Sequence, residues 1–182
     1  MAQQVAVLAG GCFWCTEAVF LDLAGVQSVE SGYTGGNTIA PTYKQICGGD
    51  TGHAEAIRIT FDADELSFDD LLDIFFATHD PTQLNRQGND VGTQYRSAIF
   101  PQSAEQEEQA RAAVARANEA NGGRVVTTIE PAAEWYPAED YHQNYWSRQG
   151  QSNPYCVATI PPKLNKLRKS FQARLKTAAA ES

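Results

Sequence analysis

Two cysteines separated by two aromatic residues stand in the stretch GGCFWCTEAVF, directly after the apolar run QVAVLA. The spacing of Cys12 and Cys15 suits a redox dithiol, a reactive nucleophile or half of a metal site. If a helix begins here, its free N–H groups and its dipole favour a thiolate, which predicts a pKa of Cys12 below about 8.5. The alternative is that both cysteines pack as small hydrophobic residues. Their position at a strand-to-helix turn favours redox chemistry.

A zinc site is the second interpretation of this spacing. Structural zinc usually takes four ligands from two close pairs. The chain has no second C-x-x-C motif, and His53, His79 and His142 stand singly, far apart in the sequence. This pattern argues against a structural zinc ion, and no metal site is predicted.

Glu55 is a carboxylate whose position suggests acid chemistry. It lies in the run HAEAIRITFD, whose period of two places it on one face with Ile57, Ile59 and Phe61, the face expected to meet the core. Burial would raise the pKa of Glu55 and let it carry a proton near neutral pH. If this end of the strand is open instead, Glu55 reaches water or pairs with an arginine. The alternation alone leaves both interpretations open.

Tyrosines and a histidine stand in two other segments. Tyr43 lies shortly before that strand, and the later stretch EDYHQNYW contains Tyr141, His142 and Tyr145, with Asp140 near its start. Phenols in an apolar pocket can donate hydrogen bonds to a developing oxyanion. Loops rich in aromatic residues also often serve only as lids over a core. Spacing alone does not separate a substrate pocket from such a lid.

The elements that must position these residues follow from the hydrophobic periodicity. Strands are predicted at 5–9 and within SVESGYTGG, HAEAIRITFD, TQYRSAIF and RVVTTIEP. Helices are predicted in FWCTEAVFLDLAGV, in SFDDLLDIFFATHD with Ser67 as its cap, in SAEQEEQARAAVARANEANGG and in PPKLNKLRKSFQARLK. Loops are predicted for APTYKQICGGDTG and for the aromatic segment from AAEWYP to NPYC.

This order of elements predicts an α+β fold. Two strand–helix–strand units favour a two-layer sandwich with a ferredoxin-like βαβ-βαβ core, a mixed but mostly antiparallel sheet, and a long irregular C-terminal wrap. With 182 residues, 42% of them hydrophobic, the chain is expected to form a single domain over 1–182. A monomer is expected, because no obvious stripe of apolar residues marks an interface.

The composition limits the partners and the setting. A net charge of -8 disfavours nucleic acid and anionic membranes as partners. The start, MAQQVAV, predicts neither a signal peptide nor a membrane span, so a cytoplasmic setting is expected. In that setting the four cysteines favour redox or metal use over a permanent disulfide framework. They are Cys12, Cys15, Cys47 and Cys156.

The longest motifs follow one another in the order GGCFWCTEAVF, GYTGG, PTYKQICGGDTGHAEAIRITFD, DVGTQYRSAIF and AEDYHQNYW. In this order they resemble the blocks of the A-type peptide methionine sulfoxide reductases. The first is similar to the GCFWG signature around the nucleophilic cysteine of that family. The resemblance extends from about Ala9 to Tyr145, which is most of the chain.

The resemblance implies thiol-dependent reduction of methionine (S)-S-oxide, free or in proteins, with no cofactor besides an external thiol reductant, thioredoxin. It implies that Cys12 attacks the sulfoxide sulfur and becomes a sulfenic acid, that a second thiol converts this to a disulfide, and that Glu55 protonates the sulfoxide oxygen. The other implied positions hydrogen-bond that oxygen or hold the substrate. They are Tyr43 and Tyr145, and Phe13, Trp14, Asp140 and His142.

The cysteines depart from the usual pattern of the family. Many relatives carry glycine where Cys15 stands and keep a resolving cysteine in a glycine-rich tail. Here the tail NPYCVATIPPKLNKLRK holds Cys156 and leads into a predicted helix. Both cysteines are therefore candidates for the resolving thiol, and either or both could act. Cys15 is slightly preferred, because residues i and i+3 in a first helical turn can meet the Cα separation of about 7 Å that a disulfide requires. Cys47 is interpreted as packing.

Two other classes of function stay open. A general C-x-x-C thiol–disulfide oxidoreductase would explain the two cysteines but neither Glu55 nor the tyrosines. A sulfoxide-binding module without turnover would need Phe13 and Trp14 but not the acid and the thiols. Consumption of more than one substrate molecule per chain in the presence of a reductant excludes the binding module.

Overall fold

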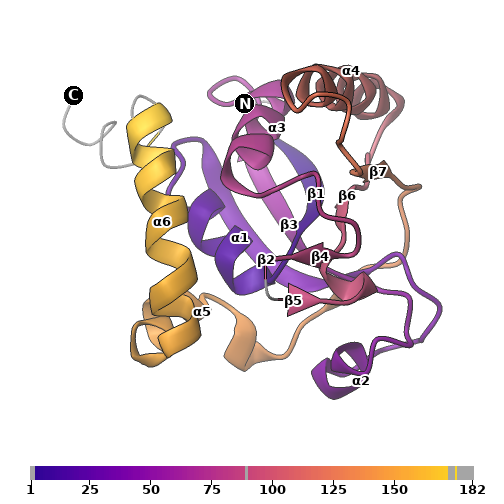
Figure 1. Ribbon diagram of the computed structural model, residues 1–182, viewed down its shortest axis with the longest axis vertical. Coiled ribbons are helices and arrows are strands. Elements are labelled where there is room, and N and C mark those ends of the chain that lie inside the picture. Colours follow the sequence, from indigo (N-terminus) through magenta and orange to yellow (C-terminus); the bar gives the residue numbers. More distant parts are fainter. Residues whose placement is uncertain (1–2, 89, 172–174, 176–182) are drawn as a thin grey trace.

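The computed structural model describes residues 3–88, 90–171 and 175 (Figure 1). In these residues one sheet has the strand order β7-β6-β1-β3-β2-β8, and a separate hairpin pairs β4 with β5. The strands are β1 (Gln3–Gly10), β2 (Val26–Thr34), β3 (Ala54–Asp62), β4 (Arg86–Gln87), β5 (Asp90–Val91), β6 (Ser97–Ile99), β7 (Thr128–Ile129) and β8 (Tyr136–Pro137).

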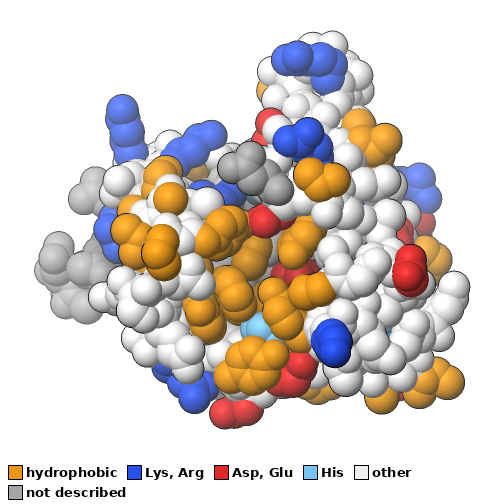
Figure 2. All heavy atoms as spheres, turned by 60° about the horizontal axis from the view of Figure 1, so that its bottom comes forward, with side chains coloured by type: hydrophobic (Ala, Val, Ile, Leu, Met, Phe, Trp, Pro, Cys, Tyr) orange, Lys and Arg blue, Asp and Glu red, His pale blue; other side chains and the backbone are white. Residues whose placement is uncertain are grey.

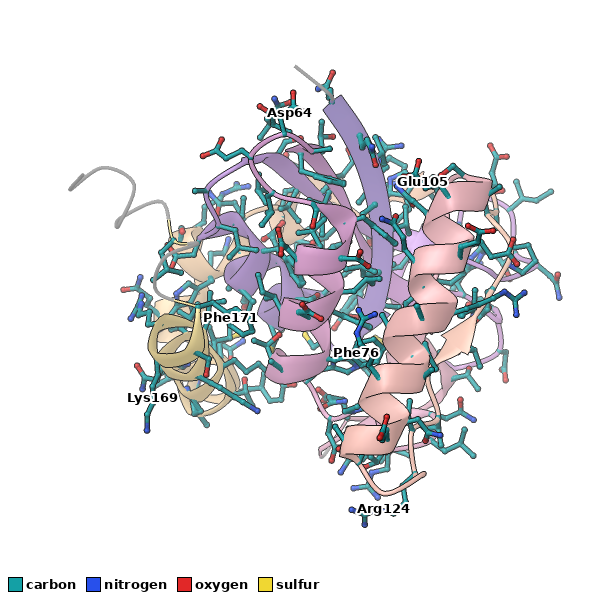
Figure 3. All side chains as sticks on the ribbon, turned by 90° about the horizontal axis from the view of Figure 1, so that it is seen from above. Asp64, Phe76, Glu105, Arg124, Lys169 and Phe171 are labelled. Carbon is teal, nitrogen blue, oxygen red and sulfur yellow. The ribbon has the colours of Figure 1, made fainter. Side chains whose placement is uncertain are left out.

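The helices are α1 (Phe13–Leu21), α2 (Tyr43–Cys47), α3 (Phe68–Thr78), α4 (Ala104–Ala120), α5 (Tyr145–Arg148) and α6 (Pro154–Ser170), with short 3-10 helices at Thr93–Tyr95, Asp140–His142 and Gly150–Ser152. α1 and α3 pack on the sheet, and α6 packs against both of these helices. α4 lies beside α3, as Figure 3 shows from above. None of the described helices combines the length and the apolar character needed to cross a membrane.

The central part of the sheet is β6-β1-β3-β2, in which every neighbouring pair is antiparallel. α1 connects β1 to β2, and α3 lies between β3 and β6. At the two edges, β7 runs parallel to β6 and β8 runs antiparallel to β2. This is the ferredoxin-like arrangement. The predicted α+β sandwich with a mixed, mostly antiparallel sheet is therefore confirmed.

The larger core lies between the sheet and the helices. On β3 the side chains of Ile57, Ile59 and Phe61 are fully buried against it, as the period of two predicts. The opposite face of the sheet carries a smaller cluster of mostly small side chains that includes Phe100, with Trp135 packed against it. The helical face therefore holds the bulk of the apolar side chains and one end of α1, where the cysteines lie.

The predicted start of α3 is also confirmed. The Ser67 hydroxyl accepts the N–H of Asp70 at 3.0 Å, and the Asp70 carboxylate accepts the N–H of Ser67 at 3.1 Å. This capping box satisfies N–H groups that a helix start leaves free. The apolar stripe of α3 follows the helical period, with Phe68, Leu71, Leu72 and Phe75 buried.

Two predicted strands are much shorter than expected. In TQYRSAIF only Ser97–Ile99 is a strand, because Thr93–Tyr95 forms a 3-10 helix after Gly92, whose φ is 144°. In RVVTTIEP only Thr128–Ile129 pairs, and this edge is held instead by a side-chain contact between Glu130 and Arg96. In both segments, hydrogen bonds made by side chains replace part of the hydrogen bonding of the sheet. Hydrophobic periodicity in the sequence carries no information about such bonds.

The stretch APTYKQICGGDTG, predicted as a loop, contains α2. Thr42 begins this short helix: its hydroxyl accepts the N–H of Gln45 at 3.2 Å, and its own N–H donates to the Gln45 side chain at 2.8 Å. The capping box is enough to stabilise one turn. Proline and glycine content predicts a loop but does not reveal such local side-chain bonds.

The C-terminal helix differs from its prediction at both ends. α6 begins at Pro154, because the Asn153 side chain accepts the N–H of Tyr155 at 2.9 Å and proline suits the first helical position. It ends at Ser170, and most of the predicted helix after Phe171 lies outside the described residues. The irregular segment was predicted to extend to Cys156. In the structure it ends earlier, because Cys156 already lies in the first turn of α6.

Candidate active site

Cys12 lies at the point where β1 ends and α1 begins. Gly11 has a φ of 96°, which a side chain would disfavour, and this residue turns the chain from strand into helix. Cys12 is the N-cap residue, and its carbonyl oxygen accepts the N–H of Cys15 at 3.1 Å and of Thr16 at 3.3 Å. The backbone N–H of Trp14 donates to the Cys12 sulfur. The sulfur thus lies at the N-terminus of the helix.

The thiols of Cys12 and Cys15 are hydrogen-bonded to each other and almost completely buried. This hydrogen bond and burial raise the pKa of Cys12 well above its ordinary value, despite the N–H of Trp14. The same hydrogen bond lowers the pKa of Cys15 against the effect of burial, helped by Thr159 and Lys163 of α6. The prediction of a lowered pKa for Cys12 was wrong, because it ignored the second sulfur and burial. Of the two thiols, Cys15 is therefore the one that loses its proton more easily.

Glu55 lies on β3 with its side chain 1% exposed. One carboxyl oxygen, Oε1, accepts the backbone N–H of Phe13 at 3.3 Å. The other, Oε2, has no hydrogen-bond partner among the described residues. Burial raises the pKa of Glu55 to about 8, so its carboxyl group is mostly protonated at neutral pH. It is a buried acid with a proton to give, next to the residue that follows Cys12.

Two phenols interact with this acid. Burial raises the pKa of Tyr43 and of Tyr95 far above the ordinary value, and the charge of Glu55 is the next cause for both residues. The charge of Cys12 acts on both as well. Both hydroxyl groups therefore remain protonated near the acid and the sulfur. They are available as hydrogen-bond donors.

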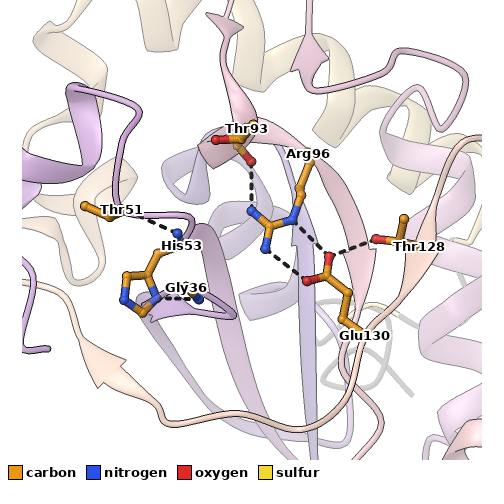
Figure 4. A network of polar contacts seen from close by, with 7 residues as sticks. All are labelled: Gly36, Thr51, His53, Thr93, Arg96, Thr128 and Glu130. Carbon is orange, nitrogen blue, oxygen red and sulfur yellow. Dashed lines mark hydrogen bonds and ion pairs between the residues drawn. The ribbon is translucent and has the colours of Figure 1, made fainter. Parts of the chain in front are cut away.

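A network of hydrogen bonds around the Arg96–Glu130 ion pair positions the short helix that carries Tyr95 (Figure 4). The Arg96 guanidinium donates to both carboxylate oxygens of Glu130, at 2.9 and 3.0 Å, and to the Thr93 carbonyl at 3.0 Å. Glu130 also accepts the Thr128 hydroxyl at 2.8 Å. A two-bond arginine–carboxylate pair of this kind fixes orientation as well as position. It ties Thr93–Tyr95 to the edge strand β7.

Aromatic rings line the site beside Cys12. The indole N–H of Trp14 donates to Nδ1 of His142 at 2.9 Å, which assigns the imidazole proton to Nε2. The His142 ring lies 4.3 Å from the Tyr43 ring and 5.1 Å from the Phe13 ring, between centroids. Burial lowers the pKa of His142, so its ring is neutral. Figure 2 shows a face on which hydrophobic side chains gather round a hollow that contains a histidine and acidic side chains.

Comparison with known proteins decides the family. The family model described as peptide methionine sulfoxide reductase matches residues 4–175. The chain belongs to this family. A relative named peptide methionine sulfoxide reductase MsrA, from Erwinia tasmaniensis, is 69% identical over 95% of this chain and 97% of its own length. The MsrA of Deinococcus radiodurans is 56% identical over 96% of this chain and 85% of its own length.

A solved structure supports the same assignment. The reduced form of Mxr1 from Saccharomyces cerevisiae is 34% identical and superposes with a TM-score of 0.75. The match covers 82% of this chain and 87% of that one. The fold of this methionine sulfoxide reductase family member is therefore shared with a solved relative.

Two predicted site residues do not face the acid in this reductase. Tyr145 stacks on Trp14, with ring centroids 4.0 Å apart, but its hydroxyl accepts a hydrogen bond from Asn153 at 3.0 Å. Asp140 has a side chain that is 92% exposed, with its carboxylate 3.7 Å from Arg148. That Asp140 helps to hold the substrate stays a prediction; in this structure its side chain points into solvent. Tyr145 therefore contributes its ring to the aromatic cluster around Trp14.

Two residues that the sequence analysis missed lie nearer to the reactive groups. Tyr95 interacts with Glu55, as described above, and Asp90 lines a cavity together with Cys12 and Cys15. The Asp90 carboxylate accepts a hydrogen bond from the Tyr155 hydroxyl of α6. Both missed residues belong to the block DVGTQYRSAIF, which contributed a predicted strand and part of the family resemblance but no predicted site residue. Membership in this block was the sequence signal that could have marked both residues as candidates for the site.

The remaining cysteines have contrasting surroundings. Cys156 is fully buried in the first turn of α6, and burial raises its pKa to about 11. The charge of Cys15 is a further cause, so the two sulfurs lie near each other. Cys47 is exposed at the end of α2, so its interpretation as a packing residue was wrong. None of these four cysteines forms a disulfide in this structure.

Proposed function

We propose that this chain reduces methionine (S)-S-oxide, free or in proteins, with Cys12 as nucleophile and Glu55 as proton donor. The observation that carries the proposal is the unpartnered, buried Oε2 of Glu55, on an acid that is mostly protonated at neutral pH. A sulfoxide is a poor electrophile until its oxygen is protonated. An acid of this kind beside a thiol pair supplies what the reaction needs.

The first step transfers oxygen from the substrate to Cys12. The substrate methyl group lies against Phe13 and Trp14, and Tyr43 and Tyr95 donate hydrogen bonds to the sulfoxide oxygen. The Cys12 sulfur attacks the substrate sulfur and forms an S–S bond while its proton passes to Cys15, and Glu55 gives its proton to the sulfoxide oxygen. The resulting hydroxyl group then moves to the Cys12 sulfur as the sulfur–oxygen bond of the substrate and the new S–S bond break, which leaves methionine and a sulfenic acid on Cys12. The substrate sulfur gains two electrons and Cys12 loses two.

The second step forms a disulfide between Cys12 and Cys15. Cys15 attacks the Cys12 sulfur, the S–O bond breaks, and the oxygen leaves as water with the proton that Cys15 took up. Cys15 already exchanges a hydrogen bond with Cys12, which favours it over Cys156. Cys156 is fully buried in α6 and its raised pKa leaves little thiolate.

An external dithiol must then reduce this disulfide, and we assign that role to thioredoxin. Another structure of yeast Mxr1 is a complex with Trx2, a match with a TM-score of 0.55 and 21% identity. No cofactor is needed, because all electrons come from thiols. Among the described residues no group of three or more His, Cys, Asp or Glu side chains could hold a metal ion. We place the reaction in a monomer in the cytoplasm, where thiols are kept reduced.

Catalytic turnover is the test of this function. Protein with an excess of dithiothreitol and methionine (S)-S-oxide is expected to form many methionine molecules per chain. A module that only binds sulfoxide forms none under these conditions, and that result would refute the proposed function. Methionine (R)-S-oxide, the other epimer at sulfur, is the matched control, and it is expected to remain unreduced.

The rate of the first step is expected to fall as the pH rises through about 8. The pKa of Glu55 is raised to about 8, so the acid form that donates the proton is present below this pH and is lost above it. Single-turnover formation of methionine, followed from pH 6 to pH 10, measures this. The same profile in Glu55→Gln should lack this transition. A wild-type rate that stays level through pH 8 to 9 would contradict the assignment of the acid.

Tyr95→Phe is expected to lower the single-turnover rate about 100-fold, because it removes a hydrogen-bond donor to the oxygen. Tyr145→Phe is the matched control, since its hydroxyl contacts Asn153 and its ring stays on Trp14. Its rate is expected to remain within a few fold of wild type. If Tyr145→Phe slowed the reaction strongly and Tyr95→Phe did not, Tyr145 and not Tyr95 would be the donor to the sulfoxide oxygen.

A further inference from the structure

The thiol pair opens toward α6 into a cavity of about 430 Å³. Its wall includes Cys12 and Cys15 on one side, and Thr159 and Lys163 of α6 on the other. The aromatic residues Phe13 and Trp14 do not line this cavity. The second thiol therefore has surroundings of its own, which the roles proposed above do not use.

Lys163 is a partly buried cation in this wall. Its ammonium group donates one hydrogen bond, to the Thr78 carbonyl at the end of α3, at 2.7 Å. Burial lowers the pKa of Lys163, and the charge of Cys15 is the largest effect that opposes this. A buried ammonium is costly unless an anion lies close to it. The bond to Thr78 supplies only a neutral acceptor, and two further N–H donors stay available for the cavity.

Thr159 is the second polar group that faces Cys15. Its hydroxyl oxygen lies 3.6 Å from the Cys15 sulfur and 2.8 Å from the Tyr155 carbonyl. The hydroxyl has one proton for these two acceptors. When Cys15 is a thiol, its S–H can donate to Thr159. When Cys15 is a thiolate, the hydroxyl proton can turn toward the sulfur instead.

The other titratable groups around Cys15 come from several elements. They include neutral and acidic side chains at the start of α1 and on β3, β5 and α6: Cys12, Glu55, Asp90, Tyr155 and Cys156. Asp90 and burial oppose a negative charge on Cys15. Lys163 is the cation of this set, and it lies in the cavity wall that Cys15 also lines.

We propose that Lys163 is a positioning residue for the second thiol, whose ammonium group holds negative charge on Cys15 in the cavity between α1 and α6. This inference rests on the proposed function, in which Cys15 forms the disulfide with Cys12. It assigns the two sulfurs different tasks. Cys12 meets the substrate, and Cys15, beside Lys163, carries the charge of the reduced pair.

The same cation directs the reduction of the disulfide. A thiolate of the external dithiol attacks the Cys12 sulfur, and a new S–S bond forms as the Cys12–Cys15 bond breaks. Cys15 leaves with the electron pair as a thiolate next to Lys163, because the better stabilised thiolate leaves faster. The second thiol of the reductant then attacks its own sulfur in the mixed disulfide and releases Cys12. The mixed disulfide is therefore expected on Cys12.

The test measures the pH at which Cys15 becomes reactive. In a parent chain with Cys12, Cys47 and Cys156 replaced by serine, alkylation of Cys15 is followed against pH. Lys163→Gln keeps an N–H donor for Thr78 without the charge, and it is expected to raise the midpoint by about one pH unit. Lys163→Arg should restore the midpoint. Lys169→Gln, which removes an exposed charge from the same helix, should leave it unchanged.

An unmoved midpoint in a folded Lys163→Gln chain would overturn the inference. If that variant does not fold, Lys163→Met, which keeps the length of the side chain without its charge, serves instead: a higher midpoint supports the inference, and an unmoved one refutes it. A purely structural role of Lys163 would change thermal unfolding but not the midpoint.

A second readout separates this inference from the proposed function. In single turnover with all four cysteines present, Lys163→Gln should still form methionine, while disulfide formation slows about tenfold and a sulfenic acid accumulates for a trapping reagent. If Lys163→Gln forms methionine and its disulfide forms as fast as in wild type, the role of Lys163 is overturned and the proposed function is not. Absence of methionine in the wild type overturns the proposed function as well.

Discussion

Cys12→Ser is expected to abolish the reduction of methionine (S)-S-oxide. Serine keeps the size and the N-cap position, but its hydroxyl is a far weaker nucleophile than a thiol whose proton can pass to Cys15. It also cannot form the sulfenic acid or the disulfide. The measurement is methionine formed per chain, with and without dithiothreitol. In both conditions we expect only the background that buffer and reductant give.

The other cysteines supply controls for this loss. Cys47→Ser changes an exposed thiol at the end of α2 and is expected to leave single turnover unchanged. Cys15→Ser is expected to form methionine at a reduced rate and then stop at a sulfenic acid on Cys12, without loss of a second thiol. If Cys12→Ser still turns over appreciably, another sulfur is the nucleophile and the proposed site is wrong.

Glu55→Gln is expected to slow the first step by about 100- to 10,000-fold, the range that a positioned general acid supplies. The amide has nearly the same shape, and its oxygen can still accept the N–H of Phe13, but it has no acidic proton to give to the sulfoxide oxygen. Single-turnover formation of methionine at pH 7 measures the effect. Binding of the substrate should change much less than the rate.

The stability of the same variant provides an independent check. A carboxyl group whose pKa is raised from 4.5 to about 8 favours folding fully below pH 4.5, and this contribution is lost as the pH rises through about 8. Glu55→Gln removes that dependence. Its free energy of unfolding should therefore fall less than that of wild type between pH 5 and pH 9.

The variant also distinguishes a reductase from a general oxidoreductase. Reduction of a protein disulfide by the C-x-x-C pair needs no acid for oxygen. Glu55→Gln should therefore leave any such activity largely intact while sulfoxide reduction fails. A near-normal rate of methionine formation in Glu55→Gln would contradict the proposed acid.

Much of the architecture was predictable because local patterns determine it. The period of two in HAEAIRITFD correctly placed Glu55 on the buried face of β3 with Ile57 and Ile59. The apolar stripe and the cap at Ser67 correctly predicted α3. The apolar run at 5–9, followed by Gly10 and Gly11 just before Cys12, correctly predicted the strand-to-helix turn. In each case the signal lies within a few residues of the feature.

The surroundings of the reactive groups were less predictable because they depend on residues far apart in the sequence. The raised pKa of Cys12 arises from its hydrogen bond with Cys15 and from burial, and Lys163 lies close to the pair on α6. Whether Tyr95 or Tyr145 approaches Glu55 is decided by how Thr93–Tyr95 and α5 pack on the sheet. The exposure of the Asp140 side chain likewise depends on the packing of its segment and not on its residue type. Types of residue indicated the chemistry, and tertiary packing selected among them.

The most direct test of the central claim is a single turnover of fully reduced protein with excess (S)-S-oxide and no reductant, counting methionine formed and thiols lost. The mechanism predicts about one methionine per chain, the loss of thiols as a pair, and a peptide map that joins Cys12 to Cys15. Reduced protein that forms no methionine, or forms it without any change at Cys12, would contradict the proposed mechanism.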